Sequence, residues 1–345
     1  MSDDLMYDGW VLAVDVGGTK MEVALVGPDG TLSGRRRVDT PASLDAEAVF
    51  APLAAAVTMV MDESVGGVVA MPDMGGVGCG GPMAAGGAHV SPLNIPAWRE
   101  FPLGERLADL TGLPMAVDND AKALALGEGW VGGAQGSRDY LAMVVSTGVG
   151  GGVVLDGRLL DGSGGNAGHI GHVVVEPDGR PCACGGRGCL EAEASGPAIA
   201  AITGRPAAEA DEAMRRRCGT LVGRAVASVA SLLDLQLALV AGSVALGFGE
   251  PFFRAAQDEV SLRCGLEFAR PTRIVPAGLG DAGPLVGAAA VARMRLATEQ
   301  TTGSDALPSP APSGVSTVAR VGAPVRGVTE SVSTDRERSS SAGSR

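Results

Sequence analysis

Apolar runs that end in glycine turns occur twice along the chain. Residues 10–16 read WVLAVDV, a Gly-Gly-Thr turn follows, and residues 21–26 form a second apolar run that closes at a Pro-Asp-Gly turn. Residues 140–155 repeat this order, with an apolar run, a Ser-Thr-Gly turn and a second apolar run before an Asp-Gly turn. Each repeat predicts a β-hairpin. Because each hairpin opens its own series of alternating strands and helices, we predict an internally duplicated α/β protein.

Apolar residues at helical spacing follow the first hairpin. Residues 45–61 place Phe50, Leu53, Val57 and Val60 on one face, which predicts an amphipathic helix. The remaining pattern predicts helices over residues 102–110, 121–130, 194–202 and 280–294, strands over residues 65–71, 115–117 and 237–240, and a solvated, arginine-rich helix face within residues 203–220.

One apolar stretch has to be weighed against a membrane span. Residues 226–249 carry a single charge, Asp234, and are long enough to cross a bilayer. The central aspartate and several glycines and serines argue against a span. We therefore predict a buried helix that ends near Leu233, a short strand and a glycine turn, with no membrane association.

Composition narrows the class of protein. The chain has 345 residues, of which 46% are apolar, so a sizeable core can form from small aliphatic side chains. The net charge of −12 disfavours nucleic-acid binding through a basic face. The acidic start lacks the apolar core of a secretion signal, and six cysteines then fit a reducing cytoplasm. From residue 297 onward Ser, Thr, Pro and Gly dominate, and we expect this tail to be disordered.

The two glycine turns have the chemistry of phosphate-binding sites. Glycines let backbone N–H groups approach an anion, and Thr19 and Thr147 each add a hydroxyl donor. Asp15, at the end of the first strand, can orient Mg²⁺ or its water. A plain hairpin is the structural alternative, and the P-loop motif is absent. The candidate phosphate and Mg²⁺ contacts are Asp15, Gly17, Gly18, Thr19, Thr147, Gly148 and Gly150.

Two stretches between the hairpins are candidate substrate sites. Residues 77–98 are rich in glycine and proline and too irregular for a regular element. A surface loop is the plain explanation, but loops of this length usually bind something, and Asn94 offers an amide to a hydroxyl group. Residues 118–121 read Asp-Asn-Asp-Ala and begin a helix directly after a strand. Either aspartate can cap that helix, whereas a carboxylate at this junction is also well placed as a general base.

Histidines and cysteines crowd into one short stretch. His169 and His172 precede Cys182, Cys184 and Cys189. Thiolates and imidazoles this close together favour a tetrahedral zinc site, and a loop with spare thiols or a disulfide is the alternative. Three cysteines need one further ligand. We assign His172 to the metal because it lies closer to the cysteines, and His169 to a nearby pocket, although spacing alone does not force this choice.

At these residues the chain resembles the ROK family of sugar kinases and related repressors. GHIGH, then CACGGRGCLE and the following EASG fall in the family's order. The resemblance covers roughly residues 10–295 and implies the actin-like ATPase and sugar kinase fold, with nucleotide held in a cleft between two duplicated α/β domains. It implies a small domain at residues 10–120 plus a C-terminal helix at about residues 281–296, and a large domain with the zinc loop at residues 121–280.

The resemblance also implies roles for single residues. The family's Asn-Asp-Ala pattern maps onto residues 119–121, which implies that Asp120 is the catalytic base. The implied sugar contacts are Asn94, Asn119, Asp120, His169 and Glu191, and the implied nucleotide contacts add Lys20 and Gly242 to the two glycine turns. Two positions depart from the pattern, because His169 replaces a glutamate that contacts sugar hydroxyls and Lys122 replaces a commonly found asparagine.

These features together predict an ATP-dependent hexose kinase, with Mg²⁺ and a structural Zn²⁺, in the form of a cytoplasmic homodimer or homotetramer. The general pattern favours glucose and therefore a glucokinase. Because an imidazole can donate to a carbonyl, an N-acetylmannosamine kinase or another amino-sugar kinase is the alternative. A repressor would need a helix-turn-helix module, and only 14 residues precede Asp15. A non-catalytic sugar-binding protein would be expected to lack Asp15 or Asp120, and both are present.

Overall fold

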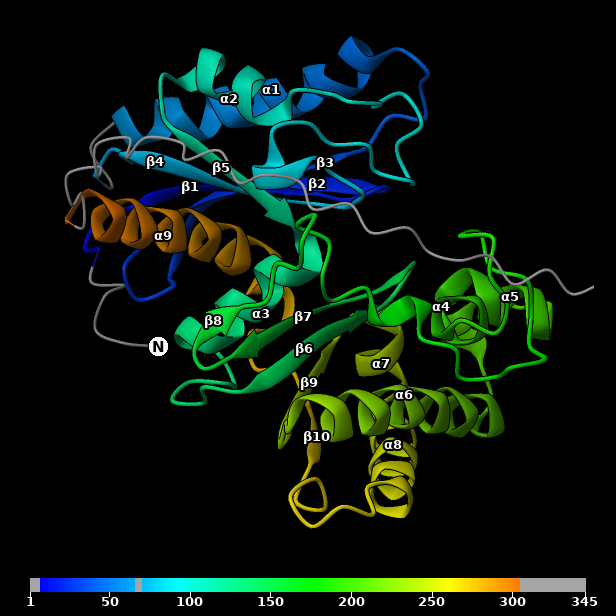
Figure 1. Cartoon of the computed structure of the whole chain (residues 1–345). Helices are drawn as coiled ribbons and strands as arrows, with labels where there is room; N and C mark the ends of the chain where they lie inside the picture. The colour runs from blue at the N-terminus through cyan, green and yellow to red at the C-terminus, as the bar shows by residue number, and fades with distance from the viewer. Residues whose placement is uncertain (1–6, 66–69, 305–345) are drawn as a thin grey trace, which may run out of the picture. The chain divides into compact units, whose positions relative to one another are not determined.

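The computed structural model describes residues 7–65 and 70–304, and two β-sheets organise them (Figure 1). The first sheet has the strand order β3-β2-β1-β4-β5. Its strands are β1 (Val11–Val16), β2 (Lys20–Val26), β3 (Leu32–Asp39), β4 (Met74–Cys79) and β5 (Met115–Asn119). Strands β1 and β2 form the predicted antiparallel hairpin, and β4 and β5 continue the sheet parallel to β1.

The second sheet repeats this plan in the order β10-β9-β6-β7-β8. Its strands are β6 (Tyr140–Val145), β7 (Val149–Leu155), β8 (Arg158–Leu159), β9 (Leu237–Ala241) and β10 (Arg273–Pro276). Strands β6 and β7 form the second predicted hairpin, and β9 and β10 continue the sheet in parallel. A hairpin followed by two parallel strands thus occurs twice, which confirms the predicted duplicated α/β fold.

Helices connect the strands and cover the sheets. The α-helices are α1 (Ala46–Val65), α2 (Leu103–Thr111), α3 (Asp120–Val131), α4 (Leu190–Ala194), α5 (Gly196–Thr203), α6 (Glu212–Leu233), α7 (Ser243–Phe248), α8 (Glu250–Arg263) and α9 (Gly283–Ser304). Short 3₁₀ turns are η2 (Ala85–Gly87), η3 (Ile170–His172), η4 (Ala207–Glu209) and η5 (Gly280–Ala282). Among the described helices, none is long and apolar enough to cross a membrane. The apolar stretch at residues 226–249 divides, as predicted, between the end of α6 and strand β9, whereas residues 243–248, predicted as part of a glycine turn, form helix α7.

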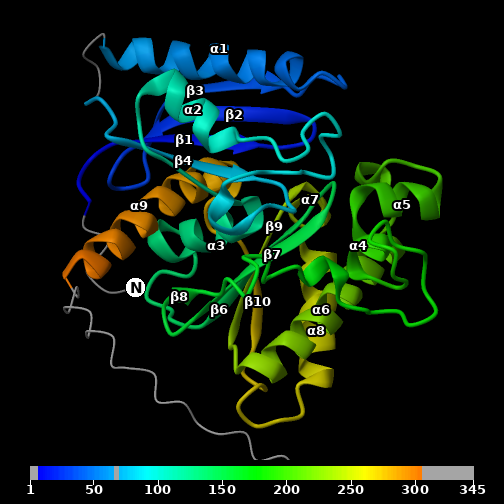
Figure 2. The same ribbon diagram turned by 45° about the horizontal axis from the view of Figure 1, so that its top comes forward.

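Strand β1 is buried on both faces, which explains its nearly continuous apolar sequence. Leu12 and Val14 pack in one core cluster with residues of α1 and α2, whereas Val11 and Ala13 pack in another with residues of α9. Successive side chains of a strand point to opposite faces, so these two clusters lie on either side of the sheet. Figures 1 and 2 both show α1 and α2 on one side and α9 on the other.

Most of the strand predicted at residues 65–71 falls on residues 66–69, which lie outside the described part of the chain. Helix α1 ends at Val65, residues 70–71 are in no strand, and the strand that follows is β4. Strand β4 reads MGGVGC, and its glycines resemble loop residues. The packing of α9 on the sheet requires glycine at position 76, because a Cβ on Gly76 would collide with the backbone carbonyl of Ala288 in α9. The small residues of β4 and α9 therefore allow the helix to lie directly against the sheet.

Two further features differ from the predictions. Helix α9 continues to Ser304, so residues 297–304 are helical although their composition predicted disorder. The remainder of the predicted tail, residues 305–345, lies outside the described residues. The sequence analysis also missed β3, β10, α7 and α8. Strand β3 is partly exposed and carries three consecutive arginines, and charged side chains of this kind are common on edge strands.

Candidate active site

A cavity of about 610 Å³ lies where the ends of both hairpins meet the loop after β4, the start of α3 and the cysteine-bearing loop. The predicted residues that line it are Asp15, Gly17, Gly18, Thr19, Lys20, Asn94, Asn119, Asp120, Thr147, Gly148, Gly150, His169 and Glu191. Gly242 is not among the residues that line this cavity. Residues that lie far apart in sequence thus come together at the carboxyl ends of β1, β4 and β5, the usual place for ligands in open α/β sheets.

The turn between β1 and β2 is fixed by hydrogen bonds and by close packing. The Thr40 hydroxyl donates to the Gly17 carbonyl at 2.7 Å, and the Gly17 N–H donates to the Lys20 carbonyl at 3.0 Å. A Cβ on Gly18 would lie 2.5 Å from the Asn94 Cβ, which is too close for any side chain. Because Gly18 has no side chain, the loop that carries Asn94 can pack directly against the candidate phosphate turn.

Lys20 lines the cavity, but its ammonium group is paired. Its Nζ lies 2.8 Å from the Glu22 carboxylate, which is only 1% exposed and also binds Arg35 and Arg37 at 2.6 Å each. Burial alone would raise the pKa of Glu22, but the hydrogen bonds from Lys20 and Arg35 outweigh burial and hold this pKa below its ordinary value. Lys20 is therefore one of three cations that surround a single buried carboxylate beside the turn.

The turn between β6 and β7 is supported by Glu191. Its Oε2 accepts the Val149 N–H at 2.9 Å and lies 3.1 Å from the position of a Cβ on Gly148. Gly242, at the start of α7, has a φ of 99°, a conformation that favours glycine. The hydroxyl of the next residue, Ser243, lies 2.9 Å from that of Ser146 in the turn. Glu191 and Ser243 of α7 thus contact the second turn through hydrogen bonds from two separate segments of the chain.

Asp15 and Asp120 approach the same point beside β4. A Cβ on Gly78 would lie 3.7 Å from Asp15 Oδ1 and 3.6 Å from the Asp120 Cα. Burial, followed by the charges of Asp120 and Glu22, raises the pKa of Asp15 to about 7. Burial also raises the pKa of Asp120, although its side chain opens onto the cavity and accepts the Ala121 N–H at 2.8 Å. Two carboxylates with raised pKa values in one cavity are typical of sites that bind a cation or move a proton.

Asn119, rather than either aspartate, caps helix α3. Its Oδ1 accepts the N–H groups of Ala121 at 3.0 Å and of Lys122 at 3.4 Å. Asp118 instead forms an ion pair with Lys122 at 2.8 Å. The two aspartates therefore have different surroundings: Asp118 is committed to a lysine, and Asp120 lines the cavity.

His169 and Asn119 approach one another across Gly81. A Cβ on Gly81 would lie 3.5 Å from Asn119 Nδ2 and 3.9 Å from His169 Nε2. The imidazole of His169 lies close enough to Asp120 to oppose the effect of burial on the carboxyl pKa. The imidazole, the amide and the candidate base thus surround one space, which Gly81 leaves open because it has no side chain.

The side chains of His172, Cys182, Cys184 and Cys189 converge, with ligand atoms within 4.8 Å of one another. His172 Nδ1 lies 3.7 Å from Cys182 Sγ, and Cys184 Sγ lies 3.8 Å from Cys189 Sγ. Tetrahedral zinc, with bonds of about 2.3 Å to sulfur and 2.0 Å to nitrogen, separates its ligand atoms by about 3.3 to 3.8 Å. The donor set and spacing therefore fit zinc. His169 and His172 both line the cavity, and His169 lies outside the four-residue cluster.

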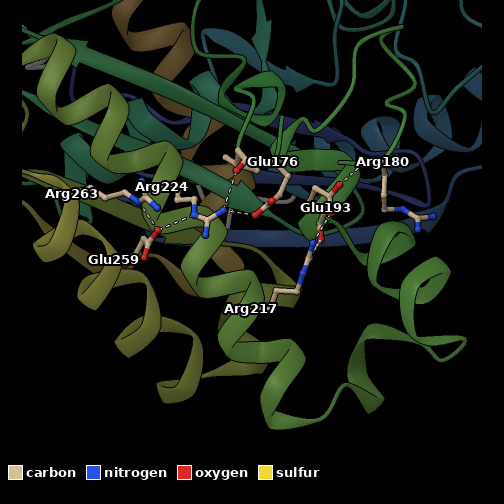
Figure 3. A network of polar contacts seen from close by, with 8 residues as sticks. Glu176, Arg180, Glu193, Arg217, Arg224, Glu259 and Arg263 are labelled. Carbon is tan, nitrogen blue, oxygen red and sulfur yellow. Dashed lines mark hydrogen bonds and ion pairs between the residues drawn. The ribbon is translucent and has the colours of Figure 1, made fainter. Parts of the chain in front are cut away.

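Arginines of helix α6 hold the cysteine-bearing loop from outside (Figure 3). Glu193, which is 2% exposed, accepts the backbone N–H of Arg180 and the guanidinium of Arg217, both at 2.6 Å. Arg224, two turns further along α6, forms an ion pair with Glu176 in the same loop. Arg217, on the helix face predicted to be solvated, is 36% exposed and also pairs its charge with the buried carboxylate of Glu193.

Some lining residues were not singled out from the sequence. Ser146 precedes Thr147 in the second turn and adds a hydroxyl to the lining. Leu93, next to Asn94, is 61% exposed and adds apolar surface. Arg180 reaches the lining only because the cysteine-bearing loop folds back onto Glu193. Ser146 could have been inferred from its neighbour Thr147, whereas the positions of Leu93 and Arg180 depend on loop conformation.

Comparison with known proteins identifies the family. The sequence model of the ROK family matches residues 11–295. The chain is 40% identical over 254 residues to an N-acetylmannosamine kinase from Escherichia fergusonii, a match that covers 69% of this chain and 84% of that protein. An N-acetylmannosamine kinase from Shigella flexneri is 38% identical over 255 residues, with the same coverage of both chains.

Solved structures agree with this assignment. A ROK family glucokinase from Streptomyces griseus, in complex with glucose and AMPPNP, has a TM-score of 0.72 at 31% identity and covers 83% of this chain and 100% of its own. A ROK hexokinase from Thermus thermophilus has a TM-score of 0.71 at 32% identity, with 83% and 99% covered. These likenesses confirm the actin-like sugar kinase fold. We conclude that this chain belongs to the ROK family and is a kinase.

Proposed function

We propose that this protein is an ATP-dependent kinase that phosphorylates N-acetylmannosamine, with Asp120 as the general base. The observation that carries the sugar assignment is His169 beside Asn119 at the cavity, where the family pattern leads one to expect a glutamate. The sequence analysis favoured glucose. The identities of 40% and 38% to N-acetylmannosamine kinases, against 31% to the glucokinase and 32% to the hexokinase, support the alternative instead.

The imidazole of His169 would account chemically for a preference for N-acetylmannosamine over glucose. An ionised glutamate only accepts hydrogen bonds, which suits sugar hydroxyls. A neutral imidazole has one donor and one acceptor nitrogen, so it can donate to the carbonyl of an acetamido group and accept from a neighbouring hydroxyl. Leu93, with 61% of its surface exposed, adds apolar surface to the same cavity for the acetyl methyl group.

Asp120 would accept the proton of the attacking sugar hydroxyl. Burial raises the pKa of this carboxyl toward the operating pH, which favours general-base catalysis. Asn119 would orient the sugar, because its side-chain oxygen is engaged in capping α3 while its nitrogen faces the space beside Gly81. Phosphoryl transfer then depends mainly on positioning and charge neutralisation.

The two glycine turns and Asp15 would hold the ATP phosphates and Mg²⁺. A bound Mg²⁺ neutralises charge on the transferred phosphoryl group. Asp15 fits this role, because the neighbouring carboxylates that raise its pKa would be offset by a divalent cation. Zinc held by His172 and the three cysteines would be structural, since all four ligands come from the protein.

His169→Glu tests the sugar assignment. The variant offers only acceptors, so kcat/KM for N-acetylmannosamine should fall by about tenfold or more relative to that for glucose. An ADP-release assay over hexoses and amino sugars measures this ratio. His89→Glu is the control, because His89 is exposed and is not part of the cavity lining. An unchanged ratio in His169→Glu would contradict the proposed role of the imidazole.

A further inference from the structure

Lys122 is a buried cation with a full set of partners. It lies in the first turn of α3, and its side chain is 3% exposed. Its Nζ lies 2.8 Å from Asp118 Oδ1, 2.6 Å from Asp161 Oδ1 and 3.3 Å from the Gly165 carbonyl oxygen. An ammonium group has three donors, and here each has an acceptor. Such a group is held in place, because the loss of any partner would leave a buried donor unsatisfied.

Asp161 and Gly165 belong to a segment that has little else to fix it. Residues 161–168 read DGSGGNAG, contain no helix or strand and are mostly exposed. The Ala167 N–H donates to the Asp161 carbonyl at 2.9 Å, a local bond within the segment. In the described part of the chain, the hydrogen bonds that reach the segment from another element come from Lys122. A glycine-rich segment loses much conformational entropy when it is ordered, so these bonds determine whether it stays in place.

The far end of the segment is fixed by packing. Gly168 has a φ of 97°, and a Cβ at this position would collide with the Gly151 carbonyl of β7. His169 follows directly and lines the cavity. Strand β7 therefore fixes the end of the segment, and Lys122 fixes its beginning and middle. Lys122 also lies in the same helical turn as Asp120, directly after the Asn119 cap.

We propose that Lys122 is a positioning residue for sugar binding, which clamps residues 161–168 onto the first turn of α3 and thereby sets where His169 stands relative to Asn119. This inference rests on the proposed function, in which His169 contacts the sugar. The asparagine commonly found here in the family pattern has a shorter side chain and two donors, so it could not bond all three partners. In this proposal Lys122 acts through geometry, because its ammonium group is paired with Asp118 and Asp161.

Two variants release the clamp from opposite sides. Lys122→Met removes the charge and keeps most of the side-chain length. Asp161→Asn removes the outer partner, and because the Asp161 side chain is 63% exposed, this variant should fold normally. Asp161→Glu keeps the carboxylate. Asp156→Asn is the matched control, since Asp156 pairs with Arg138 at the surface and does not line the cavity.

Hydrogen–deuterium exchange of substrate-free protein tests the clamp itself. In Lys122→Met and Asp161→Asn, exchange across residues 161–168 should accelerate by about tenfold, because the segment opens more often. The KM for sugar should rise by about tenfold, the factor expected when the ordered fraction of the segment, which alone binds sugar, falls to about one tenth, while kcat stays within about threefold and the KM for ATP is unchanged. The double variant should be no worse than Lys122→Met alone, because both changes break one clamp. Asp161→Glu and Asp156→Asn should resemble wild type.

Unchanged exchange in both variants would overturn the proposal, because the segment would then be ordered without Lys122. Faster exchange with an unchanged sugar KM would also overturn it, since the segment would not position a sugar contact. A wild-type protein that phosphorylates no sugar would overturn the proposed function itself. That failure is distinguishable, because the exchange measurement needs no substrate and reports on the clamp alone.

Discussion

Replacing Asp15 by asparagine should stabilise the folded protein while it removes nucleotide binding. Burial and the charges of Asp120 and Glu22 raise the pKa of Asp15 from 3.8 to about 7. Between these pH values the folded state keeps a proton that the unfolded state releases, so the free energy of unfolding falls as pH rises through this window. Above about pH 7 both states are ionised and the whole cost is present. Asparagine has nearly the same shape and no charge, so it avoids this cost.

The pKa difference sets the size of the effect. A rise of the Asp15 pKa from 3.8 to about 7 corresponds to about 4 kcal/mol at pH 8, at about 1.36 kcal/mol per pH unit. Asp15 remains partly open to the cavity, so solvent reduces this value, and we expect a gain of about 2 kcal/mol in the free energy of unfolding. At pH 5 the same reasoning leaves a gain below about 1 kcal/mol.

Urea denaturation at pH 5, 6.5 and 8, without added Mg²⁺, measures the stability of both proteins. Asp29→Asn is the control, because Asp29 is an exposed acid of the same hairpin whose pKa is lowered by hydrogen bonds from Thr31. It should give no gain at pH 8. In parallel, Asp15→Asn should lower kcat/KM for ATP with Mg²⁺ by about 100-fold or more. An Asp15→Asn variant that is no more stable than wild type at pH 8, or that keeps its full advantage at pH 5, would refute the reasoning.

Three further predictions concern the general base Asp120, the space beside Gly81 and the metal site. Asp120→Asn should lower kcat by about 10²- to 10⁴-fold while calorimetry shows sugar binding within a few-fold of wild type, and near-normal turnover would remove Asp120 from the mechanism. Gly81→Ala places a methyl group 3.5 Å from Asn119 Nδ2, so the sugar KM should rise more than kcat falls, and an unchanged KM would show that the sugar binds elsewhere. Plasma mass spectrometry of purified protein should find one zinc per chain. Cys184→Ser should reduce this zinc content, whereas Cys218→Ser, outside the cluster, should not. Zinc-free protein of full stability would contradict a structural site.

The sequence predicted the parts of the fold whose cause is local. Both hairpins were visible because apolar runs alternate with glycine turns, and both turns line the cavity. Strand β4 was missed because its glycines serve the packing of Gly76 against Ala288, a residue more than 200 positions away. A local pattern contains no information about such a distant partner. Strand β3 was hidden by its arginines, two of which, Arg35 and Arg37, bind the buried Glu22 on the neighbouring strand.

In the candidate site, too, some residues were predictable from the local sequence and others depend on distant partners. Residue type and spacing were enough to single out three cysteines with one histidine partner, and the structure brings the cysteines together with His172, the histidine preferred because it lies closer to them in sequence. The partners of Lys122 were not predictable, because Asp161 approaches α3 only after the second hairpin has turned back. Likewise, residue type and position do not separate Asp118 from Asp120 without the family resemblance, whereas in the structure Asp118 pairs with Lys122 and Asp120 lines the cavity.

A competition assay tests the proposed substrate most directly. Wild-type protein is given equal concentrations of N-acetylmannosamine and glucose with limiting ATP and Mg²⁺, and mass spectrometry separates the two phosphorylated products, whose ratio equals the ratio of kcat/KM values. We predict that phosphorylated N-acetylmannosamine exceeds phosphorylated glucose by about tenfold or more, the discrimination expected when the polar groups of a site match only one of two sugars. A product mixture dominated by phosphorylated glucose would contradict the assignment of His169 to an acetamido group and, with it, the proposed function.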